Sequence, residues 1–234
     1  MEDLTPELLA TLQRAFQTKF RQNQKLKNIQ KLVDLGDATY QQANEYAIEV
    51  GEILASVFKE NLSSENLPNG RMYYNIAKKV VEPMMVNNHV VISDNSKAIQ
   101  PLLNHQAGLG IQGQEPPLNQ DKIDGIITRL SREEHFDDVM WILDEPIINF
   151  SQSIIDDAIA TNVDFHKKAG LNPKITRTAE GGACDWCRSV EGVFDYGNEP
   201  PDFYRRHRYC RCIVEFNPKD GRGIQDSHSK RWFS

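Results

Sequence analysis

All four cysteines of this 234-residue chain lie in one short segment, GGACDWCRSVEGVFDYGNEPPDFYRRHRYCRC. Cys184 and Cys187 form a Cys-x2-Cys pair, and Cys210 and Cys212 form a Cys-x-Cys pair 22 residues further on. His207 precedes this second pair by two residues (Arg208 and Tyr209). Thiolate and imidazole are the ligands that tetrahedral zinc prefers, and short spacings let one turn supply two of them. The segment therefore predicts a structural zinc site of Cys184, Cys187, Cys210 and Cys212, with His207 as the alternative ligand.

Three other interpretations of the four thiols stay open. They could pair as two disulfides, for which four cysteines allow three connectivities, the Cys-x2-Cys pair could be redox-active, or the thiols could be inert. The N-terminal sequence MEDLTPELL lacks the basic and apolar regions of a secretory signal, so we expect a reducing compartment, which disfavours disulfides. The βαβ context of a thioredoxin-like pair is not visible around the cysteines. Metal binding is therefore the working hypothesis.

Arginine is concentrated around the same cysteines. Residues 166–234 carry 13 Lys/Arg against 9 Asp/Glu, whereas residues 1–165 carry 14 against 24, so the cysteine-bearing end is the basic end. Arginine binds phosphate in a bidentate manner, and such contacts give sequence-independent, salt-sensitive binding to DNA. The alternative is that the arginines pair with acidic side chains nearby or in the acidic remainder of the chain. The residues concerned are Arg188, Arg205, Arg206, Arg208 and Arg211.

The elements that position this segment are predicted to be mainly helical. Apolar residues recur at helical spacing through residues 1–107, which we expect to form a helical domain. The first helix is expected to begin at a Thr5 cap and to end at Gly36, and the second to run from a cap at Asp37 to about Asn61. Small residues recur every four positions in the second helix and favour close helix packing, namely Ala43, Ala47, Gly51 and Ala55.

In the later segments, proline and glycine mark the expected ends of helices and loops more clearly. A third helix over about 72–81 is predicted to break or restart at Pro83, and the stretch 86–92 is ambiguous between helix and strand. Residues 108–119, GLGIQGQEPPLN, are rich in glycine and proline and predict either a linker or a loop that docks on a neighbour. Residues 120–170 are predicted to be a helical segment, with helices at about 120–130, 132–143 and from Pro146 to Gly170.

The last part of the chain has a sequence pattern typical of short strands, not of helices. Three short β-branched or aromatic runs, at 174–178, 192–196 and 212–216, predict strands, and turn-rich segments with the cysteine pairs separate them. So few residues build a poor core unaided, so residues 171–217 are predicted to be a zinc-binding β module. Residues 218–234 are expected to be a polar tail without regular structure. The predicted fold class is mainly α, and α+β overall.

The same residues carry a resemblance to a known family. The motif Cys-x2-Cys followed by His-x2-Cys-Arg-Cys, and the run from FDDVMWILDEPIINF at 136–150 through HSKRW, resemble the minor head proteins of tailed phages and, more broadly, the Mu-F-like head-morphogenesis family. The close similarity covers at least residues 133–234. The motif positions are Cys184, Cys187, His207, Cys210, Arg211 and Cys212.

This resemblance implies a low-copy structural protein near the portal of the virion or procapsid, present in the host cytoplasm during assembly. It implies the portal and major capsid proteins as partners, and a role in head assembly, DNA packaging or ejection with weak contact to genomic DNA. The alternative is a zinc-dependent DNA-binding protein or an HNH-like nuclease acting in the host cytoplasm. We do not expect an enzyme, because the chain lacks phosphate-loop, nucleophile-elbow and His-Glu-x2-His motifs. No apolar run approaches the ~18 residues that a membrane span needs.

Overall fold

Helices form most of the described structure, and one small antiparallel sheet lies against them. The computed structural model describes residues 4–218, 224–226 and 231–233. The helices are α1 (Thr5–Gln22), α2 (Gln24–Leu35), α3 (Tyr40–Asn61), α4 (Tyr74–Gln106), α5 (Gln120–Leu130), α6 (Glu145–Lys168) and α7 (Asp185–Ser189), with 3-10 turns η1 (Ser64–Asn66), η2 (Pro68–Gly70), η3 (Phe136–Asp138) and η4 (Met140–Leu143). The strands are β1 (Lys174–Thr178), β2 (Gly192–Asp195), β3 (Ile213–Asn217), β4 (Ile224–Asp226) and β5 (Arg231–Phe233).

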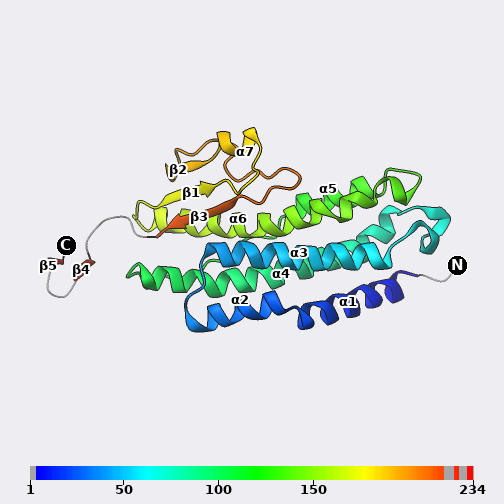
Figure 1. The fold of residues 1–234 in the computed structure, drawn as a ribbon, viewed down its shortest axis with the longest axis horizontal. Coiled ribbons are helices and arrows are strands. Elements are labelled where there is room, and N and C mark those ends of the chain that lie inside the picture. Colours follow the sequence, from blue (N-terminus) through cyan, green and yellow to red (C-terminus); the bar gives the residue numbers. More distant parts are fainter. Residues whose placement is uncertain (1–3, 219–223, 227–230, 234) are drawn as a thin grey trace.

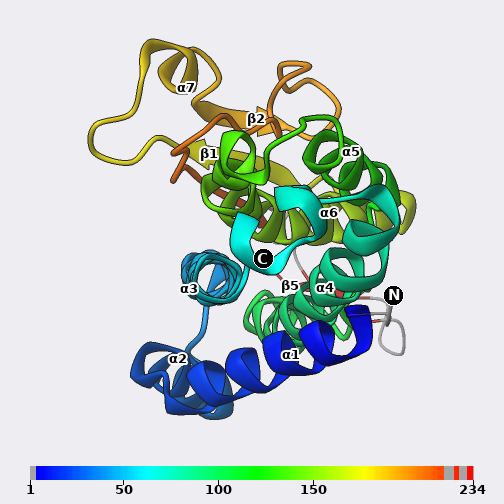
Figure 2. The same ribbon diagram turned by 90° about the vertical axis from the view of Figure 1, so that its right-hand side faces the viewer.

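Helices α3, α4 and α6 pack on one another at the centre of the molecule. Helices α1 and α2 lie on one side of them, and the sheet and α7 lie beyond α6 on the other (Figures 1 and 2). The small residues of α3 allow the close contact that the sequence predicts. A Cβ atom added to Gly51 would lie 2.7 Å from Ser151 Oγ and 3.0 Å from Ile148 Cα on α6. Any side chain at this position would therefore push the two central helices apart.

The first predicted helix is in fact two helices. The backbone of Asn23 is extended, and its side chain accepts a hydrogen bond of 3.0 Å from the backbone N–H of Leu26, which caps α2. Thr5 lies inside α1 and does not cap it. Gly36 ends α2 in the left-handed conformation, as predicted, whereas α3 is capped by Thr39 in a capping box and not by Asp37.

The predicted break at Pro83 is wrong, because α4 continues through it for 33 residues and also covers the ambiguous stretch 86–92. A proline inside a helix costs roughly 3 kcal/mol. The neighbouring side chains of Val80, Val81, Met84 and Met85 are almost completely buried, and burying each contributes about 1.5–3 kcal/mol. Tertiary packing therefore outweighs the local penalty.

Of the two connections that precede α6, the first agrees with the sequence-based expectation of a docking loop and the second does not. Residues 108–119 form a loop without regular structure that docks on α6, since the Gln114 N–H donates to Asn162 Oδ1 at 2.7 Å and Asn162 Nδ2 donates to the Gln114 carbonyl at 3.0 Å. The helix predicted over 132–143 is wrong, because this stretch contains only the turns η3 and η4. The long helix that follows ends as predicted, with Gly170 at a φ of 87°.

The sheet has the order β2-β1-β3, and all its neighbours are antiparallel. Ile175 on the central strand stands opposite Phe194 and Phe216, and it is completely buried. Phe216 contacts Tyr40 of α3 and His166 of α6, with ring centroids 5.5 and 5.1 Å apart. The sheet thus shares the hydrophobic core of the helices.

Beyond the sheet, β4 pairs with β5. The expectation of a tail without regular structure is wrong for these strands, and the remainder of 219–234 lies outside the described residues. Within the described part of the chain, no helix combines the length and the apolar character needed to cross a membrane.

Two buried histidines on the central helices predict a loss of stability in acid. His166 Nδ1 lies 2.7 Å from the Asn162 carbonyl, and its Nε2 lies 3.0 Å from Asn104 Oδ1. Burial lowers the pKa of His166 and of His89 below the ordinary value of 6.5. The unfolded chain therefore binds protons more readily, so the free energy of unfolding should be greatest above that value and should decrease as the pH falls below it.

This effect is measurable as the urea midpoint at pH 7.5 and at pH 5.5. The His89→Gln/His166→Gln variant should lose less stability between these two pH values than the wild type, while His105→Gln, at an exposed position, should behave as the wild type does. Since thiols and any bound metal are common to all three proteins, the difference isolates the buried histidines. Equal losses in the wild type and the double variant would contradict the prediction.

Candidate metal centre

The first cysteine pair is positioned by the short helix α7. Cys184 is its N-cap residue, with an extended backbone, and Cys187 lies in its first turn. Residues three apart on a helical turn lie on the same face, so the two thiols point in one direction. Gly182 precedes them with a φ of 84°, a conformation that side chains with a Cβ rarely adopt, and lets the chain turn into α7.

The second pair lies where the chain enters β3. The Cys210 N–H donates to the His207 carbonyl at 3.0 Å, and Tyr209 between them has a φ of 64°. This tight turn brings the His207 imidazole and the second pair of thiols to the same side of the chain. We refer to residues 204–212 as the cysteine loop.

The five predicted ligands come together. His207 Nε2 lies 3.3 Å from Cys184 Sγ and 2.9 Å from Cys187 Sγ, and Cys187 Sγ lies 3.9 Å from Cys210 Sγ. A zinc ion with Zn–S bonds of 2.3 Å separates two tetrahedral sulfur ligands by about 3.8 Å. The donor atoms form two groups, each within 4.8 Å, which are Cys184, Cys187 and His207, and Cys187, Cys210 and Cys212. The shared Cys187 joins them into one cluster.

The cluster has a buried side, which faces the protein interior, and an exposed side, which faces solvent. Cys187, Cys210 and Cys212 are each 1% exposed, whereas Cys184 is exposed. All four are free thiols, so the disulfide alternative does not describe this structure. The Trp186 and His207 rings pack in a T-shaped arrangement with centroids 5.5 Å apart, and the Arg208 carbonyl lies 2.6 Å from His207 Nδ1, which leaves Nε2 directed at the cysteines.

Buried guanidinium groups lie behind the inner thiols. Arg177 of β1 donates to Cys210 Sγ at 3.6 Å, and its other amino group donates to the carbonyls of Phe203 and Arg205. Hydrogen bonding to Cys212 lowers the pKa of Cys210 to about 4, and the charges of Arg206 and Arg177 act in the same direction. A thiolate is the form of cysteine that binds a metal.

The pKa values of the Cys184 and Cys187 thiols are shifted in opposite directions. A hydrogen bond from the backbone N–H of Cys187 lowers the pKa of Cys184, which is the outer end of the cluster. Burial raises the pKa of the Cys187 thiol. A divalent cation would stabilise the thiolate there, because a coordinated thiol is deprotonated outright.

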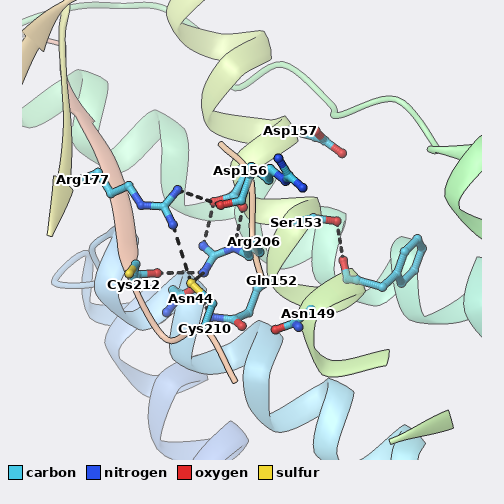
Figure 3. A network of polar contacts seen from close by, with 12 residues as sticks. Asn44, Asn149, Gln152, Ser153, Asp156, Asp157, Arg177, Arg206, Cys210 and Cys212 are labelled. Atoms are coloured by element: carbon cyan, nitrogen blue, oxygen red, sulfur yellow. Dashed lines mark hydrogen bonds and ion pairs between the residues drawn. The ribbon is translucent and has the colours of Figure 1, made fainter. Parts of the chain in front are cut away.

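Arg206 ties the cysteine loop to α6 through a buried ion pair (Figure 3). Its Nε and Nη2 donate to the two carboxylate oxygens of Asp156 at 2.5 and 2.8 Å, and Nη1 donates to the Cys212 carbonyl at 2.8 Å. Both side chains are almost fully buried, at 4% and 2% exposure. In the amide orientation that satisfies its neighbours, Gln152 donates to the Cys210 carbonyl at 2.8 Å and accepts from Arg206 at 3.0 Å.

Two further contacts join the loop to the start of α6. Arg211 binds Glu145 with both amino groups, at 2.9 and 3.2 Å, and Asn149 donates to the His207 carbonyl at 2.9 Å. Such bidentate pairs fix geometry as well as charge. The backbone that carries the second pair of ligands is therefore held by one face of α6.

The five arginines predicted to contact DNA have different environments. Arg206 and Arg211 pair with acids of the helical region, which is the alternative that the sequence left open. Arg188, Arg205 and Arg208 are exposed, and Arg208 lies over the Trp141 and Tyr209 rings at 5.3 and 4.9 Å. The structure therefore leaves three of the five exposed, although Arg188 donates to the Ala183 carbonyl at 3.2 Å and Arg205 lies 3.6 Å from Asp202 at the surface.

The residues that lie behind the cluster, Gln152, Asp156 and Arg177, were not predicted from the sequence. Asp156 follows Ile148 and Gln152 at four-residue spacing, so an acid and an amide stand on an otherwise apolar helical face. A charged residue in such a position is rarely buried without a partner, and this was the available signal. Nothing comparable identified Arg177, because one arginine in a short strand is ordinary.

Comparisons of the chain with models of protein families, with curated proteins and with solved structures found no match. The site's chemistry must therefore be inferred from its own geometry. In the described residues, both groups of candidate metal ligands belong to this one cluster. Three buried thiols with either Cys184 or His207 would fill a tetrahedral coordination sphere, which is the arrangement of a structural metal site.

Proposed function

We propose that this chain is a structural minor protein of a tailed-phage head in which a zinc ion holds the cysteine loop and the sheet on the helical bundle. The observation that carries the proposal is the assembly of the motif residues into one cluster. In that cluster Cys187 is 3.9 Å from Cys210 and 2.9 Å from the His207 imidazole. The same motif underlies the resemblance to head-morphogenesis proteins.

Zinc is the metal that fits these donors best. Sulfur and imidazole ligands in tetrahedral arrangement favour zinc or iron–sulfur chemistry, whereas magnesium and calcium prefer oxygen. Cys187, Cys210 and Cys212 would bind the ion on the inner side, and Cys184 or His207 would complete the set. When bound, the ion would cross-link α7 to the start of β3, and Arg206 would anchor that cross-link to Asp156 of α6.

The position in the particle is proposed from the resemblance. We propose a low-copy component near the portal, in contact with portal and major capsid proteins during head assembly, DNA packaging or ejection. The ion pairs of Arg206 with Asp156 and of Arg211 with Glu145 support a structural role for the motif, because these arginines bind other residues of the same protein.

Quantitative mass spectrometry of purified heads and procapsids tests the assignment. We expect the chain at a few copies per particle, and about one zinc per purified chain by elemental analysis. Particles that never contain the chain would exclude the head-protein role. Purified protein without bound zinc, after expression in zinc-containing medium, would exclude the metal and leave the particle assignment to the first measurement.

A DNA-binding protein or HNH-like nuclease is the second candidate, supported by the exposed Arg188, Arg205 and Arg208. It predicts retention of plasmid at low salt or metal-dependent nicking of supercoiled DNA. Nicking that His207→Ala abolishes would establish catalysis. Retention that Arg205→Ala/Arg208→Ala weakens, without nicking, would establish binding alone.

A further inference from the structure

A groove with a cationic rim and an apolar floor lies beside the metal centre, between α5, α6 and the cysteine loop. It encloses about 500 Å³. Its apolar lining residues, which we call the floor, are Ile126, Trp141, Ile142, Pro146 and Phe150, and its charged lining residues are Lys122, Arg129, Arg205, Arg206 and Arg208. Gly125, Asn149, Ser153 and Tyr204 complete the lining. No carboxylate is among its described lining residues, although the protein as a whole carries a net charge of −6. The groove is thus a positive site on an acidic protein.

Four of these five cations are available to a ligand. Arg206 is committed to Asp156 and is almost fully buried. The acids that face three of the others lie outside the groove at the surface, with Arg129 3.0 Å from Glu133, Lys122 4.0 Å from Asp157 and Arg205 3.6 Å from Asp202. Exposed ion pairs of this kind contribute little and exchange readily with other partners.

The floor selects the kind of partner. Trp141 is 44% exposed, which is unusual for so large an apolar side chain, and the guanidinium of Arg208 lies 5.3 Å from its ring centroid. Single-stranded nucleic acid needs a series of free aromatic faces on which bases stack. This groove has three aromatic lining residues, of which Trp141 is covered by the Arg208 guanidinium, Phe150 is 4% exposed and Tyr204 is partly buried, so it offers no series of free rings. Such a floor fits apolar side chains.

The geometry points to a docking site for an acidic, amphipathic peptide segment of a partner protein. One or two apolar side chains of the segment would enter the groove and contact Trp141 and Ile126. Its carboxylates would pair with Arg129 and Lys122 on α5 and with Arg205 and Arg208 on the opposite rim. The apolar anchors supply most of the affinity in such interfaces, and the complementary charges set orientation and rate of association. This inference does not depend on the assignment to a phage head.

The test is a selection from a display library of random 16-residue peptides against the full-length protein. Peptides that bind should carry a net negative charge and at least one Leu, Ile, Phe or Trp. Arg129→Glu/Arg205→Glu should weaken the selected peptides about tenfold or more in fluorescence anisotropy, since each like-charge contact opposes binding. Lys27→Glu/Lys31→Glu is the matched control, because it changes the net charge equally on exposed positions of α2, across the molecule from α5 (Figure 1).

A second variant separates docking from simple charge attraction. Trp141→Ala keeps every charge and should also weaken the selected peptides. Unchanged binding to this variant, or equal loss with the α2 control, would overturn the proposal. So would a selection that yields no peptide, or only neutral and basic ones. Tight binding of a single-stranded oligonucleotide that Arg129→Glu/Arg205→Glu abolishes, in the absence of peptide binding, would identify a nucleic-acid site instead.

Discussion

Replacing Cys187 by serine is expected to abolish binding of the metal ion and to release α7 from the cysteine loop, which α6 still holds through Arg206 and Arg211. Cys187 is the donor common to both groups, so the four donors that remain without it fall into two separate pairs, Cys184 with His207 and Cys210 with Cys212. Structural zinc sites contribute about 10–16 kcal/mol of apparent binding free energy in small domains. Elemental analysis should show loss of zinc, and limited proteolysis should cleave within 171–217 much faster than in the wild type.

The Cys184→Ser variant is the informative control. Cys184 is exposed at the outer end of the cluster, and its removal leaves Cys187, His207, Cys210 and Cys212 as a complete set. This variant should keep the metal with lower affinity and resist protease at saturating zinc. Full zinc content and unchanged protease resistance in Cys187→Ser would show that the ligands are assigned wrongly.

Replacing Asp156 by alanine should destabilise the protein by about 3–5 kcal/mol, because Arg206 would remain buried without its counter-ion. For a chain of this size this corresponds to a decrease in Tm of roughly 6–20 °C. The measurement is thermal or urea unfolding of zinc-loaded protein. The loss should occur with the metal still bound, since Asp156 contacts no ligand side chain other than through Arg206.

The neighbouring Asp157→Ala is the matched control. Asp157 is partly exposed, burial raises its pKa, and its ion pair with Lys122 is long at 4.0 Å. Its replacement should therefore cost less than about 1 kcal/mol. The Asp156→Leu/Arg206→Met double variant should be more stable than Asp156→Ala, since neither charge is then left alone in the core. Similar destabilisation by Asp156→Ala and Asp157→Ala would show that the buried pair has no special weight.

The sequence was most informative where a local signal decides the structure. Gly36 and Gly170 end helices because they adopt the left-handed conformation there, and the predicted strand at 174–178 is observed with the same bounds. The five candidate ligands were identified by residue type and spacing alone, and they converge. The metal itself, like the function, remains a proposal.

The sequence failed where tertiary contacts override a local signal. Pro83 does not interrupt α4, because buried neighbours on the same helix outweigh its cost. Arg206 looked like a DNA contact because arginine clusters bind phosphate, yet its partner Asp156 lies 50 residues earlier in the chain. Spacing reveals which residues lie together on one helix or turn. It does not reveal which distant side chain will face them.

The 50-residue separation of Asp156 and Arg206 along the chain also sets the order of events during synthesis. A ribosome adds about 5–20 residues per second, so Asp156 is made some 3–10 s before Arg206. During this interval Asp156 has no guanidinium with which to enter the core, and a bare carboxylate there is costly. The nascent helices must therefore keep that face of α6 hydrated until the cysteine loop emerges. The final packing of α6 in the helical bundle is thus coupled to translation of the cysteine loop.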